Sequence, residues 1–174
     1  MTEKSKNAEI RVDVNYANDL ITDIFKAKSC NDHEARTIAQ RLSGSNLVGH
    51  DSHGIARVPR YVEWMERGWV FPNLKPEVVI DAGAMGCLDA KQGFGQVAGE
   101  YAVDDGITRA KKHGVSVVGL RNSGHLGRIG DWAERAADAG LISFHFVNVR
   151  GSFCLLYTSP SPRDRTRSRM PSSA

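Results

Sequence analysis

Apolar residues recur at helical spacing through the first third of the chain, which predicts a helical segment from residue 14 to residue 68. We expect a first helix from Val14 to Lys28 and a second that begins near Asn31. A third helix should run from Val58 to Arg67, because Pro59 suits the first turn of a helix and Gly68 is a good terminator.

The start of the second helix has the sequence of a capping box. Asn31 should accept a hydrogen bond from the free N–H groups of the first turn, and Glu34 should reach back to the backbone of Asn31. The apolar side of this helix is predicted to bury Ala35, Ile38, Ala39, Leu42 and Leu47.

The pattern changes after residue 76, and an α/β segment is expected over residues 77–153. Short apolar stretches at 77–81 and 86–89 predict a hairpin, and a helix should follow over 96–112. The nearly continuous apolar run at 115–120 is typical of a strand buried on both faces. With a helix at 129–139 and a strand at 141–149, it predicts a βαβ unit. The expected fold is α/β, with N-terminal helices followed by a mixed sheet.

The excess of positive charge lies at the C-terminal end of the chain. The chain of 174 residues has a formal net charge of +3, but residues 154–174 carry four arginines and one aspartate. Without them, basic and acidic side chains are equal in number, so the basicity does not indicate a nucleic-acid partner. Residues 1–13 are polar and are expected to form a disordered lead-in.

Residues 154–174 have the sequence of a translated sequencing adapter. A common library adapter, read in frame, encodes Cys154 to Asp164 without a mismatch, and its far end encodes Ser168 to Ala174. The three residues between them correspond to an index. We therefore expect 154–174 to be a non-native tail, and the natural protein to continue differently after Phe153.

The remaining cysteines, Cys30 and Cys87, have no metal-binding spacing, and the polar N-terminus is not a secretory signal. No apolar run approaches the length of a membrane span. A cytoplasmic protein with free thiols and no membrane partner is expected.

Two glycine-flanked loops carry the candidate chemistry. One is Gly49–Arg57, with the sequence GHDSHGIAR, and the other is Asn122–Gly127, with the sequence NSGHLG. His53 and His125 are candidate general acids that could protonate a carbonyl oxygen. Arg57 could bind a carboxylate through two parallel N–H bonds.

Ser52 and Tyr61 are candidate hydrogen-bond donors to the same substrate, although Ser52 is also a common turn residue and Tyr61 could belong to the core. A small anionic compound with a carbonyl group would suit this set. Arg57 could instead pair with a nearby acid, which is the commoner role of a single arginine.

Two other classes of function remain open on the residues alone. His50, His53 and His125 could form a three-ligand site of a metal-dependent hydrolase. The N-terminal helices could alternatively be a non-catalytic oligomerisation module. The glycines from Gly93 to Gly99 have the spacing GxGxxxG, which lacks the context of a dinucleotide fingerprint and favours a tight turn into a helix.

Three stretches resemble the type-2 malate/L-lactate dehydrogenases, which include ureidoglycolate, sulfolactate and diketogulonate dehydrogenases. They are GHDSHGIARVPRYVEWMERG, LDAKQGFGQVAGEYAVDDGI and VVGLRNSGHLGRIGDWAERAADAGLISFHFVNV, and the resemblance runs from about Val14 to Val149. It implies a non-Rossmann oxidoreductase that uses NAD or NADP on small 2-hydroxy or 2-oxo acids, and a homodimer.

The same resemblance assigns residues. It places the family's histidines on His53 and His125 without choosing which carries the proton, and its substrate-binding residues on Arg57, Ser52 and Tyr61. A serine that contacts the cofactor in some members falls on Val149. Most of the nucleotide site would lie after Phe153, so the chain is expected to be an inactive N-terminal fragment.

Overall fold

The structure is a computed structural model that describes residues 11–148. Residues up to Phe144 belong to one compact unit, and the last described residues, from His145, belong to a second. Most of the expected lead-in, the cofactor position Val149 and the expected non-native tail 154–174 lie outside the described residues. No helix between residues 11 and 148 has the length and apolar character needed to cross a membrane.

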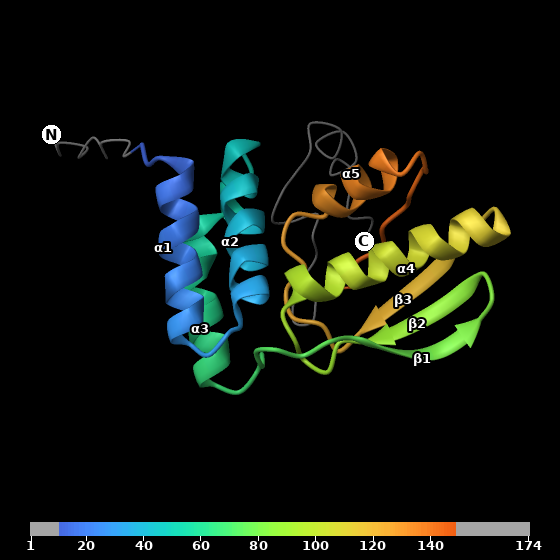
Figure 1. The fold of residues 1–174 in the computed structure, drawn as a ribbon, viewed down its shortest axis with the longest axis horizontal. Coiled ribbons are helices and arrows are strands. Elements are labelled where there is room, and N and C mark those ends of the chain that lie inside the picture. Colours follow the sequence, from blue (N-terminus) through green and yellow to red (C-terminus); the bar gives the residue numbers. More distant parts are fainter. Residues whose placement is uncertain (1–10, 149–174) are drawn as a thin grey trace, which may run out of the picture. The chain divides into compact units, whose positions relative to one another are not determined.

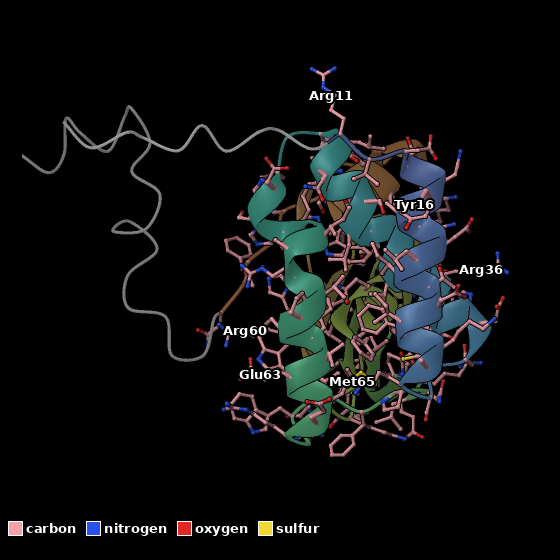
Figure 2. The ribbon with its side chains drawn as sticks, turned by 90° about the vertical axis from the view of Figure 1, so that its left-hand side faces the viewer. Arg11, Tyr16, Arg36, Arg60, Glu63 and Met65 are labelled. Atoms are coloured by element: carbon pink, nitrogen blue, oxygen red, sulfur yellow. The ribbon has the colours of Figure 1, made fainter. Side chains whose placement is uncertain are left out.

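Three helices form the N-terminal part, as the apolar pattern predicts. They are α1 (Val14–Ala27), α2 (Asp32–Leu47) and α3 (Val58–Glu66), and Figures 1 and 2 show them packed together. The side chain of Asp13 caps α1 by accepting from the backbone N–H groups of Asn15 and Tyr16. Pro59 lies in the first turn of α3, where its missing N–H costs nothing.

Half of the predicted capping box is present at the start of α2. The Asn31 side chain accepts from the Glu34 N–H at 2.9 Å, as expected. The reciprocal bond was predicted wrongly, because the buried Glu34 carboxylate accepts from the Asn73 N–H at 2.7 Å instead. The burial predicted for Leu47 is also wrong, since this last residue of α2 is 71% exposed.

Three aromatic side chains, two from these helices and that of Phe94, pack against each other in the core. The ring of Phe25 on α1 lies 6.4 Å from that of Tyr61 on α3 and 5.6 Å from that of Phe94. All three side chains are almost fully buried, and burying an aromatic residue is among the larger hydrophobic contributions to stability. In Figure 2, Met65 lies on the side of α3 that faces α1, whereas Arg60 and Glu63 lie on its outer side.

The sheet has three strands in the order β1 (Glu77–Ala82), β2 (Met85–Asp89), β3 (Val117–Arg121). β1 and β2 form the predicted antiparallel hairpin, and β2 pairs in parallel with β3. Two further helices are α4 (Gly95–His113) and α5 (Gly130–Asp138). Figure 1 shows α4 lying along the sheet.

The sheet is mixed and includes a βαβ unit, but not the one expected. The unit consists of β2, α4 and β3, because α4 makes the crossover between the two parallel strands. The prediction of a strand at 141–149 is wrong for the described part, since 141–148 forms no strand. Between residues 11 and 148 the sheet contains only β1, β2 and β3, so the apolar pattern of this stretch was not sufficient to predict a strand.

The prediction that the 115–120 strand is buried on both faces is also wrong. Along β3, residues alternate between exposed and half-buried, and Val117 is 60% exposed. Within residues 11–148, β3 pairs only with β2, and α4 packs against it. A continuous apolar run therefore marks a strand here without revealing how many of its faces are covered.

Candidate active site

The loop between α2 and α3 consists of two short 3-10 turns, η1 (Asp51–His53) and η2 (Ile55–Arg57). Asn46, near the end of α2, holds both turns. Its amide nitrogen donates to Asp51 Oδ1 at 2.6 Å, and its amide oxygen accepts from the Ile55 N–H at 2.8 Å. A Cβ atom on Gly54 would overlap the Asn46 side chain, so a larger residue at position 54 would have to displace the amide that holds both turns.

The second loop lies between β3 and α5 and carries His125. It is held by backbone bonds to the segment that precedes α4: the Gly124 N–H donates to the Gly93 carbonyl, and the Gln92 N–H donates to the Asn122 carbonyl. A Cβ atom on Gly95 would overlap the His125 carbonyl oxygen. Gly93 and Gly95, at the turn that opens α4, therefore allow the His125 loop to pack closely against the first turn of that helix.

The two loops bring their histidines together. The rings of His53 and His125 are stacked, with centroids 5.0 Å apart and an interplanar angle of 29°. Tyr61 of α3 lies beside them, and its Oη is 2.8 Å from His125 Nδ1. The Trp64 ring makes an edge contact with His125 at 6.3 Å. Side chains from η1, α3 and the His125 loop thus form one cluster.

Ser52 and Arg57 complete the set that the sequence singled out. Ser52 Oγ is 2.9 Å from His53 Nδ1, and Arg57 Nε donates to the Ser52 carbonyl oxygen at 2.6 Å. Among residues 11–148, no carboxylate lies within ion-pair distance of Arg57, so the expected alternative of an acid partner does not apply there. With no such partner among the described residues, its other N–H groups could bind an anion.

Burial controls the protonation of this cluster. Desolvation, with the charges of His53 and Arg57, lowers the pKa of His125 to about 4. The pKa of His53 is lowered by burial and by the charges of His50 and Arg57. Burial raises the pKa of Tyr61 to about 12, against the opposing effects of the Gln96 hydrogen bond and Arg57. At neutral pH both imidazoles are therefore neutral, and the phenol keeps its proton.

An open pocket of about 390 Å³ adjoins the cluster. Its lining residues are Val48, His50, His53, Arg128, Ile129 and Gly130. Of the five expected site residues, only His53 lines it. Arg128 was not expected from the sequence, and its guanidinium is already neutralised by Asp131 and Glu134. A small molecule in this pocket would contact His53 directly.

The site contains two supporting residues that the sequence did not predict. Asn46 positions the first loop, and the buried Gln96 donates from Nε2 to Tyr61 Oη at 2.6 Å. Their signal in the sequence is weak, because an amide in a helix is ordinary. The one sign in the sequence is that Gln96 is a polar residue among the apolar positions at the start of α4.

The metal-site alternative is not favoured. The three histidines do come together, with the His50 and His53 ring centroids 4.4 Å apart. However, within the described part of the chain, no group of three His, Cys, Asp or Glu side chains is placed so that it could hold a metal ion. In addition, Nδ1 of His53 lies 2.9 Å from Ser52 Oγ and Nδ1 of His125 lies 2.8 Å from Tyr61 Oη, so each of these nitrogens already has a hydrogen-bond partner.

The chain belongs to the family described as malate/L-lactate dehydrogenase, whose profile it matches over residues 12–159. It is 43% identical over 141 residues to hydroxycarboxylate dehydrogenase B of Escherichia coli strain K12, covering 81% of this chain and 39% of that protein. It is 34% identical over 140 residues to L-lactate dehydrogenase of Cupriavidus necator, covering 80% of this chain and 40% of that protein.

Solved structures show the same fold. Malate dehydrogenase from Pyrococcus horikoshii superimposes with a TM-score of 0.73 at 32% identity, covering 80% of this chain and 41% of that one. The expected fold class and family resemblance are therefore confirmed. The chain spans about two fifths of the length of these relatives.

Proposed function

We propose that this chain supplies the acid–base and carboxylate-binding part of a dehydrogenase that interconverts small 2-hydroxy and 2-oxo acids. One observation carries the proposal: two stacked imidazoles, each with a lowered pKa, lie beside an arginine that has no carboxylate partner among residues 11–148. An arginine of this kind binds a substrate carboxylate, and a neutral imidazole exchanges a proton with an adjacent oxygen. The names of relatives, which include lactate, malate and sulfolactate dehydrogenases, support the substrate class.

In this proposal Arg57 binds the substrate carboxylate, and the ring nitrogens of His53 and His125 lie near the oxygen on the adjacent carbon. Ser52 orients His53 through its hydroxyl group, and Tyr61 orients His125. The proton leaves or joins the substrate oxygen as the C–H bond on the same carbon is broken or formed. A positioned proton donor of this kind contributes roughly 10²–10⁴ in rate.

A nicotinamide cofactor, NAD or NADP, would accept or supply the hydride. The described residues do not fit this cofactor at the glycine-containing turn that opens α4. Carbonyl oxygens of Gly124 and His125 occupy the space at Gly95, where a phosphate would have to approach the first turn of α4. We therefore propose that the nucleotide binds residues outside 11–148, that Val149 lies near it, and that the 174-residue chain alone has no dehydrogenase activity.

The homodimer and the cytoplasmic location expected from the sequence belong to the same proposal. The non-catalytic alternative, an oligomerisation module, does not account for an arginine and two histidines gathered at one place. No further observation favours it, and membership of a dehydrogenase family is unfavourable to it.

The test is a screen with the complete coding sequence. The enzyme should oxidise NADH or NADPH in the presence of at least one 2-oxo acid, such as oxaloacetate or pyruvate, and the 174-residue chain should not. Arg57→Ala and His53→Ala should each abolish most of the turnover. Unchanged turnover in both variants would support the non-catalytic alternative and refute the proposal.

A further inference from the structure

We infer that Gln96 is a positioning residue that acts through Tyr61 to fix His125 in one neutral tautomer, with the proton on Nε2. Gln96 lies in the first turn of α4 and touches neither histidine in the hydrogen-bond network. The inference is independent of the cofactor, and only its catalytic use rests on the proposed function.

The geometry is a linear chain of two hydrogen bonds. Gln96 Nε2 donates to Tyr61 Oη at 2.6 Å, and Tyr61 Oη is 2.8 Å from His125 Nδ1. The side chains of Gln96 and Tyr61 are both 1% exposed, so bulk water does not compete for these bonds. A phenol that accepts from an amide uses its own proton for the next acceptor, which here is Nδ1.

A backbone group fixes the direction of the chain independently. The Gly127 N–H points at His125 Nδ1, with a nitrogen–nitrogen distance of 3.3 Å. A backbone N–H can only donate, so Nδ1 must be an acceptor. In a neutral imidazole the proton then resides on Nε2.

The orientation of the Gln96 amide follows from the same constraint. If its oxygen faced Tyr61, the phenol would donate to Gln96 and would have no proton for Nδ1. The observed orientation leaves Gln96 Oε1 buried without a hydrogen-bond partner among the described residues. Among the described residues, the amide nitrogen of Gln96 therefore donates to Tyr61 while its amide oxygen has no hydrogen-bond partner. A buried polar atom without a partner is unusual.

The surroundings of His125 oppose its protonation from every side. Tyr61 on α3 and the Gly127 N–H block Nδ1, while His53 on η1 and Arg57 on η2 bring positive or potentially positive charge. His53 is less constrained, because the Ser52 hydroxyl can either donate to its Nδ1 or accept from it. The two histidines, which the sequence leaves equivalent, therefore differ: His125 presents a fixed N–H, and His53 is free to change its protonation.

Histidine NMR on the 174-residue chain tests the inference without substrate or turnover. In a chain labelled with ¹⁵N at histidine, a long-range ¹H–¹⁵N spectrum distinguishes a protonated ring nitrogen from an unprotonated one. At neutral pH, His125 should show an unprotonated Nδ1 and a protonated Nε2. The signals are assigned by their loss in His125→Asn.

Two variants probe the role of the chain of bonds. Gln96→Glu keeps the shape but offers a carboxylate that accepts the Tyr61 proton, so at mildly alkaline pH, where the carboxylate is ionised, His125 should shift toward the Nδ1–H tautomer. Tyr61→Phe removes the hydroxyl and leaves only the Gly127 N–H at 3.3 Å to favour an unprotonated Nδ1, so the Nδ1–H tautomer should gain population relative to the wild type. Gln40→Glu, the same change at an exposed site on α2, should leave the His125 signals unchanged.

Observing His125 in the wild type as the Nδ1–H tautomer, or seeing the wild-type pattern persist in both Gln96→Glu and Tyr61→Phe, would overturn the inference. The outcome is separable from that of the proposed function. A complete enzyme that reduces no 2-oxo acid would refute the function and leave the tautomer result standing, and the reverse also holds.

Discussion

The ring of His125 lies stacked on the ring of His53, with centroids 5.0 Å apart, although η2, α3, β1, β2, α4 and β3 separate the two residues in the sequence. A positive charge on one ring disfavours a charge on the other, which is one reason why the pKa of His125 is lowered. Because of this repulsion, the two neutral rings together bind at most one further proton near neutral pH.

Replacing Arg57 by lysine should weaken substrate binding in the complete enzyme. Lysine keeps the charge but loses the two parallel N–H bonds, and a hydrogen bond to a charged group contributes about 1.5–3 kcal/mol. We expect KM for the 2-oxo acid to rise about 10- to 100-fold, with a smaller change in kcat. Steady-state kinetics measure this. Arg60→Lys, on the outer side of α3 in Figure 2, is the control, and an equal rise in KM for both variants would argue against a role for Arg57.

Removing the His53 ring should act on turnover more than on binding. In His53→Ala we expect kcat to fall by roughly 10²–10⁴ with KM changed only slightly, as is typical for loss of a positioned proton carrier. His33→Ala, at an exposed position in the first turn of α2, should retain full kcat. If both variants were equally active, the proton would have to be carried by another group.

The stability of the chain should decrease as the pH falls from about 6.5 to about 4. His125 has a pKa of about 4 in the folded chain and an ordinary value of 6.5, so between these values the unfolded chain binds more protons. Its contribution to the free energy of unfolding is fully present above pH 6.5, on the order of 3 kcal/mol, and is lost by about pH 4.

Urea unfolding followed by tryptophan fluorescence across this range measures the effect. A His125→Asn variant, which has no group to titrate at this position, should lose less stability over the same pH interval. Identical slopes for the wild type and the variant would contradict the lowered pKa.

The contact between Gly54 and Asn46 should appear as a coupling in a double-mutant cycle. Gly54→Ala places a methyl group onto the Asn46 side chain, and overpacking of this kind costs about 1–3 kcal/mol. In the background of Asn46→Ala the same substitution should cost clearly less, because the obstructing amide is absent.

Gly44→Ala, in the last turn of α2 with open space around its Cβ position, is the matched control and should be neutral or slightly stabilising. Chemical denaturation of the four members of the cycle gives the coupling free energy. Strict additivity would show that the loop adapts without strain.

Local features of the fold could be predicted because the chemistry that sets them is local. The helix start at Asn31, the hairpin around Gly83 and the end of α4 at Gly114 each depend on a few neighbouring residues. The failures involve distant partners. Glu34 bonds to Asn73 rather than to its own cap, and the strand that pairs in parallel with β3 is β2, not a later segment.

The same distinction between contacts of neighbouring residues and contacts of distant residues applies to the candidate active site. His53, Arg57 and Ser52 are close in the sequence, so their proximity in space follows from the loop. The loop pattern and the family resemblance both indicated that His53 and His125 serve one site, but neither predicted that their rings would stack. Gln96 could not be identified, because its role depends on the positions of Tyr61 and Gly127 around His125. Hydrogen-bond direction is a property of the assembled structure.

The seating of the His125 loop on Gly95 has a consequence for protein engineering. Neither histidine loop is self-supporting, since one rests on Asn46 and the other on the turn that opens α4. Grafting the histidine pair onto a foreign scaffold would therefore require the whole block from residue 46 to residue 127. A short peptide that contained only one of the loops would carry its imidazole but would not place that ring against the ring of the other histidine.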